Sequence, residues 1–429
     1  MKKILVISYY WPPSGGAGVH RWLGFVKYLQ MQGHKMVVYT PENPDAAVED
    51  TSLINEIPKD VEVIKQSIWE PYSYYKKLIG QKKDEKINPG FLTEKKKPGL
   101  AENFAVWVRG NLFIPDARKF WIKPSIKFLK KYILSNDIDL IISTGPPHSM
   151  HLIGLGLKKA LGIKWIADFR DPWTNIDFYD QLKLSAASDR KHRKLEKEVL
   201  EKADLTIAVG NTLASELKEL GASNVHVVTN GFDGTIVQSK VIPGKFTIGH
   251  FGSFTASRNP STLWKVLSDL CNENKEFQND LRIELVGKVD LSIQSDIEKH
   301  GLNDHVQKVG QVDYSEAQER MEKCQVLLLV ANDTPNAKGI LTSKMFEYMR
   351  TSRPILAIGP QDSDMSSVMQ DAFACKTIEY KDEDGMKKEV NLLYEKYKKG
   401  ELKVDGTKIN KYHREELSKS LHCYINQIL

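Results

Sequence analysis

The sequence predicts an α/β protein with two Rossmann-like domains, each built on a doubly wound parallel sheet covered by helices. Short runs rich in Val, Ile and Leu recur along the chain without polar alternation, as strands buried on both faces require. Stretches of helical period separate these runs and supply the crossovers, for example 19–32, 148–161 and 211–220. Apolar residues make up 41% of the 429 residues and charged residues 27%, a composition that excludes a mainly disordered chain.

Two series of strands divide the chain into domains. The first series is predicted at 3–8, 35–40, 138–143, 163–168, 205–210 and 225–229. The second is predicted at 246–251, 282–287, 306–309, 326–331 and 354–359. Between them, residues 233–245 contain two Gly and one Pro and have no clear period. We therefore expect an N-terminal domain over 1–235, a C-terminal domain over 246–410, and a helix over 411–429 that can pack back across the domain junction.

Basic charge is concentrated in one segment of the chain. The net charge is +6, from 61 Lys+Arg and 55 Asp+Glu. Residues 61–131 hold 16 Lys+Arg and 7 Asp+Glu, which gives +9 and leaves −3 for the remainder, so a general coat for nucleic acid is not expected. We interpret 70–131 as a basic, aromatic helical insertion in the N-terminal domain. It fits an anionic membrane surface, and a solvated Lys-rich face is the alternative.

The cysteines and the apolar runs indicate where the protein works. The four cysteines are far apart, which argues against a disulfide framework or a structural zinc site and is typical of a reducing cytoplasm. No stretch approaches the ~18 apolar residues that a membrane-spanning helix needs. We expect a cytoplasmic protein that can also bind peripherally at the inner face of the membrane.

The first candidate site is Trp11-Pro12-Pro13-Ser14-Gly15-Gly16-Ala17-Gly18, between the first predicted strand and a helix. Gly15 and Gly16 would let a phosphate approach the backbone, and the helix N-terminus offers N–H groups to it. The pattern is neither a dinucleotide fingerprint nor a Walker loop. A tight strand-to-helix turn without a ligand is the alternative.

The second candidate site opens a helix in the C-terminal domain. Thr342 or Ser343 is expected as the N-cap, and the N–H groups of the first turn, together with Lys344, can bind a diphosphate. Glu347 lies about one turn further on the same face and can accept both hydroxyls of a ribose. The alternative is an ordinary capped helix with a surface Glu–Lys pair.

The third candidate site follows two neighbouring strands of the N-terminal domain. Asp168, Arg170 and Asp171 stand at the carboxyl end of the predicted strand 163–168, where ligands bind in such sheets, and are candidate catalytic residues. His148 follows the preceding strand and is a further candidate. A structural Arg–Asp network, and a histidine that only caps its helix, are the alternatives.

The fourth candidate is Arg258, which follows the strand 246–251 and can reach a diphosphate in a cleft between the domains; a solvated Arg is the alternative. No His-Glu-x-x-His or Gly-x-Ser-x-Gly motif occurs in the sequence. We therefore expect no catalytic metal, no serine nucleophile and no cofactor.

Taken together, these motifs resemble those of a GT-B glycosyltransferase of the family-4 type. The resemblance covers nearly the whole chain, and its anchors are 12–16, 33–37, 228–233, 344–348 and 353–356. It implies two domains that close around a cleft, and retaining transfer of a hexose from a nucleotide sugar to a glycan or lipid-linked acceptor. Synthesis of a cell-surface polysaccharide is the setting that it suggests.

The resemblance also implies residue roles. Gly16 would approach the donor phosphate, Arg258 the diphosphate and Glu347 the ribose, while Gly310 and Val312 would meet the base. The chain departs from the family pattern at three positions: Gly339 replaces the first Glu of the family's Glu-x7-Glu motif, Ser253 replaces a second basic residue, and Arg170 replaces a His. Asp333 is a candidate substitute for the missing Glu.

The expected mechanism needs no metal, because Arg258, Lys344 and helix N-termini can neutralise the leaving diphosphate. The resemblance implies front-side displacement, in which the leaving phosphate helps to take the acceptor's proton. A nucleotide-sugar epimerase of the same fold and a non-catalytic sugar- or membrane-binding scaffold are the alternatives. A nicotinamide dehydrogenase is not indicated, because no full dinucleotide fingerprint is present.

Overall fold

The computed structural model describes residues 1–46, 48–70, 100–238 and 240–429; for residues 100–103 and 105 it describes the backbone alone. The described chain divides into two compact units. Unit 1 contains Met1–Thr229 and Arg414–Leu429, and unit 2 contains Asn230–His413. The Lys-rich stretches at 82–83 and 95–97, which form part of the predicted basic insertion, lie outside the described residues.

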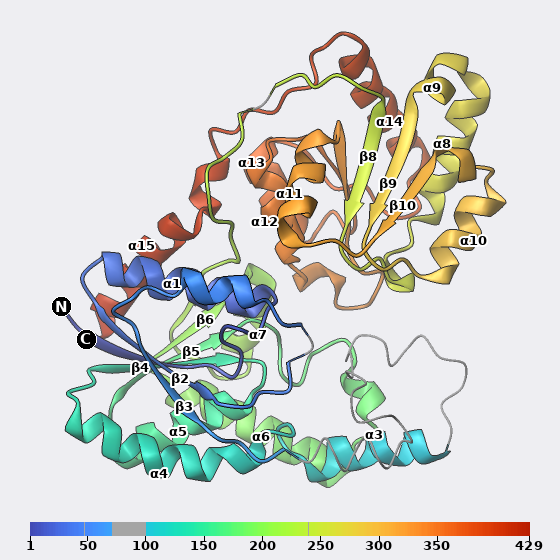
Figure 1. Ribbon diagram of the computed structural model, residues 1–429. Coiled ribbons are helices and arrows are strands. Elements are labelled where there is room, and N and C mark those ends of the chain that lie inside the picture. The colour runs from blue at the N-terminus through green and yellow to red at the C-terminus, as the bar shows by residue number, and fades with distance from the viewer. Residues whose placement is uncertain (47, 71–99, 239) are drawn as a thin grey trace. The chain divides into compact units, whose positions relative to one another are not determined.

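Within the described residues, unit 1 contains a seven-stranded parallel sheet in the order β3-β2-β1-β4-β5-β6-β7 (Figure 1). Its strands are β1 (Lys3–Ile7), β2 (Lys35–Pro41), β3 (Glu62–Gln66), β4 (Leu140–Gly145), β5 (Lys164–Phe169), β6 (Leu205–Ala208) and β7 (Val225–Val227). The strand order reverses between β1 and β4, as in a Rossmann-like domain. The carboxyl ends of β1, β4 and β5 therefore meet at one edge of the sheet.

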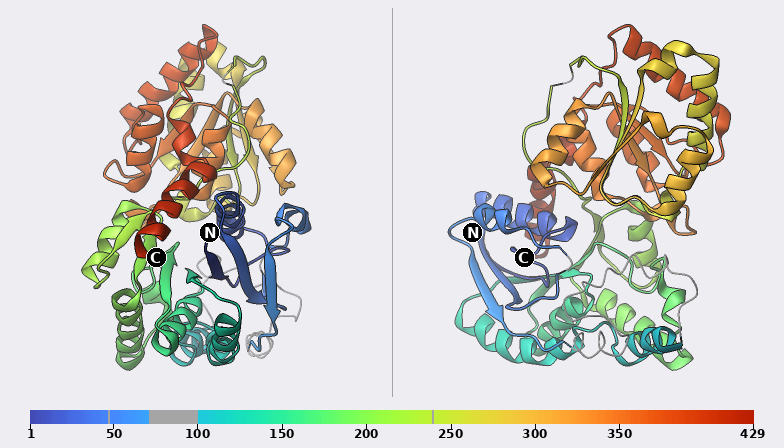
Figure 2. Two further views of the ribbon diagram at one scale, coloured as in Figure 1. Left: turned by 90° about the vertical axis from the view of Figure 1, so that its left-hand side faces the viewer. Right: turned by 45° about the vertical axis from the view of Figure 1, so that its right-hand side comes forward.

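Helices cover both faces of this sheet. One face packs against α1 (Ala17–Met31) and α15 (Arg414–Ile428), which share an apolar core that includes Trp22, Phe25 and Leu421. The other face packs against α4 (Lys119–Ser135), α5 (Ser149–Leu161), α6 (Ala186–Lys202) and α7 (Asn211–Glu219). Because α15 returns to unit 1, both termini of the chain lie close together there (Figure 2).

The segment that precedes β4 differs from its prediction. It forms α3 (Leu100–Leu112) and α4, and in α4 the Trp121 ring stacks on Tyr39 of β2 with ring centroids 4.8 Å apart. Leu129 and Ile133 of α4 are also buried in the main core of unit 1. α4 is therefore a core crossover helix, and the prediction that the insertion extends to residue 131 is wrong.

Within the part of the chain that the structure describes, unit 2 contains a five-stranded parallel sheet in the order β10-β9-β8-β11-β12. Its strands are β8 (Phe246–Phe251), β9 (Leu281–Val286), β10 (Val306–Gly310), β11 (Val326–Val330) and β12 (Ile355–Ile358). One core lies under α8 (Ser261–Glu273), α9 (Lys275–Asp280), α10 (Leu291–Lys299) and α14 (Glu383–Lys398). The other lies under α11 (Tyr314–Lys323), α12 (Ser343–Arg350) and α13 (Asp364–Phe373).

The predicted fold class is confirmed: the two units are Rossmann-like α/β structures with parallel sheets. The sequence placed the ends of all observed strands except β3 within two residues. It missed β3 because this edge strand pairs only with β2 and its Glu-Val-Ile-Lys-Gln sequence is polar and half exposed.

Candidate active site

In each sheet the strand order reverses beside the first strand, at β1/β4 in unit 1 and at β8/β11 in unit 2. Ligands of open parallel sheets bind at the carboxyl ends of the strands at such a reversal. All four sequence-predicted sites lie on segments that follow the carboxyl ends of strands. Each unit therefore has its own group of candidate residues.

A basic cluster lies at the carboxyl edge of the unit 2 sheet. Lys344, in the first turn of α12, donates from Nζ to the Ser253 carbonyl at 2.9 Å and lies 3.3 Å from His250 Nε2. Arg258 follows β8 and donates from Nε to Asn332 Oδ1, just after β11, at 2.5 Å. A backbone hydrogen bond from Asp333 to the Ser257 carbonyl (2.7 Å) joins the same two loops. The surface Lys344–Glu347 pair that the sequence left open is therefore not formed, because Lys344 points toward β8.

His250 fixes the direction of Lys344. Its ring is buried and stacks on Phe254, with centroids 3.8 Å apart, and its Nδ1 lies 3.1 Å from the Leu328 carbonyl. Since Nδ1 donates to that carbonyl, Nε2 is left to accept a hydrogen bond from Lys344 Nζ. Burial and the neighbouring Lys344 charge hold the pKa of His250 well below its usual value. Burial and the Arg258 guanidinium likewise lower the pKa of Lys344 to about 7.

The N-terminus of α12 has no side-chain cap. Thr342 occupies the N-cap position, as predicted, but its hydroxyl makes no capping hydrogen bond, and the first turn contains no acidic residue. Thr342 Oγ1 is buried without a hydrogen-bond partner among the described residues. The N–H groups from Ser343 onward thus lack a side-chain cap beside Lys344, an arrangement that favours an anionic ligand.

Glu347 has a partner that the sequence did not reveal. Its Oε2 accepts a hydrogen bond from the hydroxyl of Tyr314, the first residue of α11, at 2.7 Å. Gly310 ends β10 with a φ of +78°, a conformation that side-chain-bearing residues rarely adopt, and Val312 packs partly against the core. The segment 310–314 thus contains the two residues predicted to contact the base and also Tyr314, the partner of the predicted ribose contact Glu347.

Gly339 lies in a short 3-10 turn, Ala337–Gly339, beside Lys338, which forms an ion pair with Asp362. Asp333 is held by its backbone bond to Ser257, next to Arg258. The loop that carries Asp333 therefore contacts the loop that carries Arg258, the candidate for diphosphate binding. Asp333 stays a candidate substitute for the missing Glu.

In unit 1, the glycine loop leads into α1. Gly15 donates its N–H to the Val48 carbonyl at 2.9 Å, and Gly16 is the exposed N-cap of α1 with a φ of +103°. Neither a capping side chain nor an acidic first-turn residue is present at this end of α1. Gly15 thus lies in a tight turn, whereas Gly16 leaves the helix N-terminus exposed.

Arg170 packs against this helix N-terminus. A Cβ atom built on Gly18 would lie only 1.7 Å from Arg170 Nη1, so the guanidinium occupies the space that any side chain at residue 18 would need. Arg170 also donates to the Pro146 carbonyl, and its Nε is buried without a partner among the described residues. Asp171, the next residue, is exposed. The sequence placed Gly18 in the first candidate site but did not pair it with Arg170, because nothing in the linear pattern connects the two residues.

Asp168 lies in the core, not in a site. It is fully buried, and its carboxylate accepts hydrogen bonds from Arg21 Nη2 (2.8 Å) and Trp22 Nε1 (2.7 Å). Thr144 Oγ1 donates a third at 2.8 Å. The predicted catalytic role of Asp168 is therefore wrong, because every one of these partners is an internal group. The alternative, a structural Arg–Asp network, is correct, but its arginine is Arg21.

His148 also lies inside unit 1. It stands at the N-cap position of α5 without making a capping hydrogen bond, and its buried ring stacks on Trp173 with centroids 4.8 Å apart. Burial, followed by the neighbouring His151, holds the pKa of His148 well below its usual value. The geometry favours a neutral, packed histidine over a proton carrier in contact with substrate.

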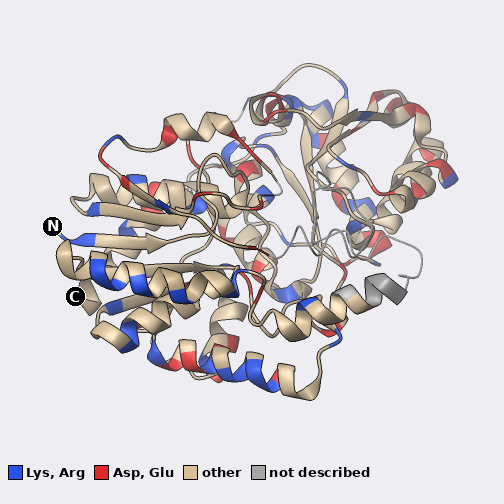
Figure 3. Cartoon of the chain, turned by 60° about the horizontal axis from the view of Figure 1, so that its bottom comes forward, with Lys and Arg blue, Asp and Glu red and all other residues tan. Residues whose placement is uncertain are grey.

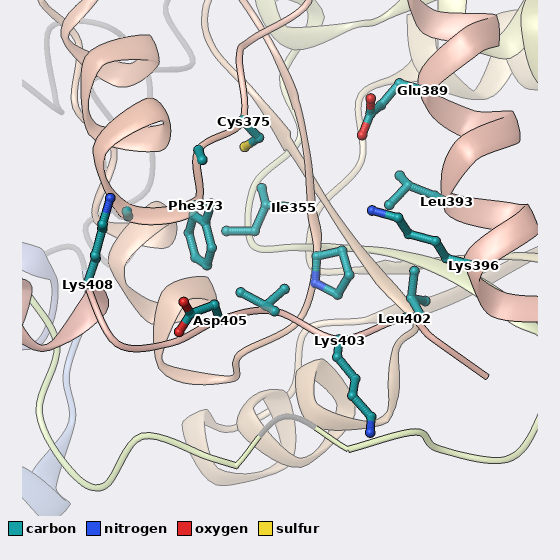
Figure 4. A pocket seen from close by; sticks show the side chains of 14 residues that line it. Ile355, Phe373, Cys375, Glu389, Leu393, Lys396, Leu402, Lys403, Asp405 and Lys408 are labelled. Atoms are coloured by element: carbon teal, nitrogen blue, oxygen red, sulfur yellow. The ribbon is translucent and has the colours of Figure 1, made fainter. Parts of the chain in front are cut away.

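A cavity of about 230 Å³ lies elsewhere in unit 2 (Figure 4). Pro354 and Ile355 at the start of β12, Phe373 at the end of α13, and Leu393 and Lys396 of α14 contribute to its lining. Because Ile355 begins β12, this cavity is at the amino edge of the sheet, opposite the edge that carries Arg258 and Lys344. We do not assign it to the substrate.

Among the described residues, no group of three or more His, Cys, Asp or Glu side chains is arranged to hold a metal ion. In that same part of the chain, no helix is both long enough and apolar enough to cross a bilayer.

Comparison with known proteins identifies the family. The family model described as Glycosyltransferase Family 4 matches residues 14–235, more than half of the chain. The chain belongs to glycosyltransferase family 4. The match spans the Gly16 turn, Arg170 and strands β2 to β7 of unit 1. The protein is therefore a glycosyltransferase, and the resemblance seen in the sequence is confirmed. No curated protein matches the chain.

Solved structures confirm the GT-B fold of this family-4 protein. Sucrose-phosphate synthase from Thermosynechococcus elongatus is similar with a TM-score of 0.63 at 13% identity, over 100% of this chain and 99% of that one. TarM gives 0.63 at 11% identity, over 100% and 99%. The lipopolysaccharide outer core galactosyltransferase WaaB gives 0.58 at 12% identity, over 100% of both chains.

The contact between Gly18 and Arg170 gives a first prediction for this glycosyltransferase. The change Gly18→Ala should lower kcat about 10- to 100-fold, because the added methyl group must displace the Arg170 guanidinium while Ala favours the helix. Steady-state transfer kinetics measure the effect, and a thermal melt checks the fold. In the double variant with Arg170→Ala, the Gly18 change should add nothing to the loss. An unchanged kcat in Gly18→Ala would show that the position of Arg170 does not matter.

Proposed function

We propose that this glycosyltransferase binds a nucleotide-sugar donor at the carboxyl edge of the unit 2 sheet and transfers the sugar, with retention and without metal, to a glycan or lipid-linked acceptor. The observation that carries this proposal is the basic cluster of Arg258 and Lys344 beside the uncapped N-terminus of α12. Two cations and a helix N-terminus are the groups that bind a diphosphate in the absence of a metal ion.

The neighbouring residues fit the other parts of the donor. The Glu347 carboxylate accepts the ribose hydroxyls, and Tyr314 orients it through the 2.7 Å hydrogen bond. The exposed backbone at Gly310 and the half-buried Val312 meet the base. Asn332, which contacts Arg258, and Asp333, whose backbone bonds to the adjacent Ser257, can accept hydrogen bonds from hydroxyls of the donor sugar. Support for a nucleotide also comes from the structurally similar S. aureus TarM, of which a variant was crystallised with UDP and α-GlcNAc-glycerol.

The proposed reaction is a front-side displacement. The bond between the anomeric carbon and the diphosphate oxygen breaks, and the bond to the acceptor oxygen forms on the same face. The acceptor's proton passes to the leaving diphosphate, so no separate base is needed. Arg258, Lys344 and the α12 N–H groups stabilise the charge that develops on the leaving group.

Unit 1 is proposed to bind the acceptor. Arg170 and the exposed Asp171 are the polar side chains at the carboxyl end of β5, and Gly16 leaves the N–H groups of α1 accessible to an anion. We propose that the enzyme takes part in the synthesis of a cell-surface polysaccharide at the inner face of the membrane. The fold similarity to WaaB, which is named as a lipopolysaccharide outer core galactosyltransferase, supports this proposal.

The donor can be identified by a screen for thermal stabilisation with UDP-, GDP-, ADP- and TDP-sugars. A ligand that binds only the native state raises its stability with concentration and affinity. We expect nucleotide sugars with one of the four bases to raise the melting temperature of the protein strongly. The nucleotide sugar that stabilises the protein most should also support transfer in a panel of acceptors. Stabilisation by none of the four would contradict the proposed donor class.

Lys344 makes donor binding depend on pH. Because its pKa is lowered to about 7, Lys344 is charged only below that pH in the free protein, and at pH 8 about nine-tenths of it is neutral. A bound diphosphate favours the ammonium form. Binding at pH 8 should therefore take up protons, and affinity should fall as pH rises above 7.

Calorimetric titrations in buffers with different heats of ionisation measure this proton uptake. The change Lys344→Arg keeps a positive charge at pH 8 and should abolish the uptake while retaining binding. Subtracting the two data sets removes any titration of the nucleotide itself. Equal proton uptake by the parent and Lys344→Arg would place the titrating group elsewhere.

A further inference from the structure

The solvent-facing side of α4 combines positive charge with exposed apolar side chains. Its inner stripe, Trp121, Ser125, Leu129 and Ile133, is buried at four-residue spacing. The residues on the opposite side form what we call the α4 outer face: Phe120, Lys123, Lys127, Lys130, Lys131 and Leu134. All six are exposed, and their spacing of three and four residues places them in one stripe along the helix.

The charge on this face is uncompensated. α4 contains no Asp or Glu, so in Figure 3 it shows blue without red, whereas α6 of the same unit shows both. Within the described residues, none of the four lysines of the α4 outer face has an ion pair. Solvated helices in this protein commonly pair their charges at i and i+4, as Arg193 does with Asp189 in α6. The α4 outer face lacks this pairing.

Exposed apolar groups flank the lysines. Leu134 exposes 68% of its surface and Phe120 40%. Trp69, with 57% of its surface exposed, packs edge-on against Phe120 with ring centroids 4.8 Å apart. α3, which precedes α4 in the chain, exposes Phe104 and Trp107 as well. Exposing such side chains to water is unfavourable, whereas at a bilayer the rings reach the headgroup boundary while lysines contact lipid phosphates.

We propose that the α4 outer face, together with Trp69, binds the surface of an anionic lipid bilayer. The proposal extends the proposed function by naming the surface through which the enzyme reaches a membrane-bound acceptor. It places the contact on the ordered outer side of a core helix. The lysines without ion pairs attract the anionic lipid headgroups, and the aromatic and aliphatic side chains at the ends of the stripe insert into the bilayer surface.

Co-sedimentation of the full-length protein with vesicles tests the proposal. The vesicles contain phosphatidylcholine with or without about 30% phosphatidylglycerol, because anionic lipid is the component expected to matter. We expect binding to the anionic vesicles, weakened by high salt, and little binding to phosphatidylcholine alone. Absence of binding by the parent protein would overturn the proposal.

Matched variants locate the contact. Lys123→Glu, Lys127→Glu and Lys131→Glu together should weaken partition into anionic vesicles about 100-fold or more, since each basic residue near the surface contributes about fivefold. The control reverses Lys191, Lys194 and Lys197, exposed lysines of α6, and makes the same change in net charge. It should alter partition less than about threefold, and equal losses in the two triple variants would overturn the proposal.

A second pair of variants separates a membrane from other anionic partners. Trp69→Ser with Leu134→Ser leaves every lysine in place and should weaken vesicle binding about tenfold or more. Tighter binding of a nucleic-acid oligomer than of anionic vesicles, or no effect of these two changes, would rule out the bilayer. Thermal stabilisation by the nucleotide sugar in lipid-free solution should stay the same in all these variants. A failure of the membrane proposal can therefore be distinguished from a failure of the proposed donor site.

Discussion

Replacing Arg258 by Ala should lower kcat/KM for sugar transfer about 100- to 1000-fold without unfolding unit 2. The guanidinium lies with Lys344 beside the α12 N-terminus, and its loss leaves the leaving diphosphate with Lys344 and the α12 N–H groups. Removing one preorganised group that stabilises developing charge costs about 10²–10³ in rate. Steady-state kinetics with the donor identified by thermal stabilisation measure the effect, and a thermal melt confirms folding.

Two further variants sharpen this result. Arg258→Lys keeps the charge but loses the planar fork, so it should be intermediate. Arg282→Ala is the matched control, because Arg282 lies on β9 and bonds to Gln307 on the neighbouring strand, apart from the Lys344 cluster. Its kcat/KM should stay within about threefold of the parent value. A loss in Arg258→Ala no greater than in Arg282→Ala would remove Arg258 from the reaction.

Replacing Glu347 by Ala should weaken nucleotide binding about 100-fold or more. A carboxylate that accepts two hydroxyl groups makes charge-assisted hydrogen bonds, each contributing about 1.5–3 kcal/mol. Glu347 is half-buried on α12, and its Tyr314 partner is exposed, so the change leaves the core intact. Isothermal titration of the parent and the variant with the same nucleoside diphosphate measures the loss.

Two further measurements test whether the loss of binding in Glu347→Ala comes from the ribose hydroxyls. Tyr314→Phe keeps the Glu347 carboxylate but removes the group that orients it, so binding should weaken about three- to tenfold. With a 2′,3′-dideoxy nucleotide, which lacks both hydroxyls, the parent, Tyr314→Phe and Glu347→Ala should bind about equally. If Glu347→Ala binds the normal nucleotide as tightly as the parent does, the ribose role of Glu347 is wrong.

Local sequence patterns were sufficient for the fold and for the unit 2 candidates. Buried strands are continuous apolar runs, and the loop that follows each strand must lie at the carboxyl edge of its sheet. Arg258 and Lys344 each follow such a strand in the sequence, so their convergence around the ends of β8 and β11 could be expected from strand order. The structure adds the orientation of Lys344 toward Ser253, which no spacing rule provides.

Contacts between distant segments could not be predicted in the same way. Asp168 and Arg170 are two residues apart, yet one is buried against Arg21 and the other lies against Gly18. Both partners lie on α1, which is far away in the sequence, so no pattern within β5 and the loop that follows it could reveal either contact. The one available signal was Arg21 itself, a charged residue beside Trp22 on the apolar side of a helix, which requires a buried acidic partner.

Hydrogen–deuterium exchange with a saturating nucleoside diphosphate tests the donor site most directly, because it both detects binding and locates it along the chain. We expect slower exchange in residues 252–258, 310–314 and 342–348, with the same pattern lost in Glu347→Ala. Protection confined to unit 1, or to the cavity around Ile355 and Phe373, would contradict a donor site at the carboxyl edge of the unit 2 sheet.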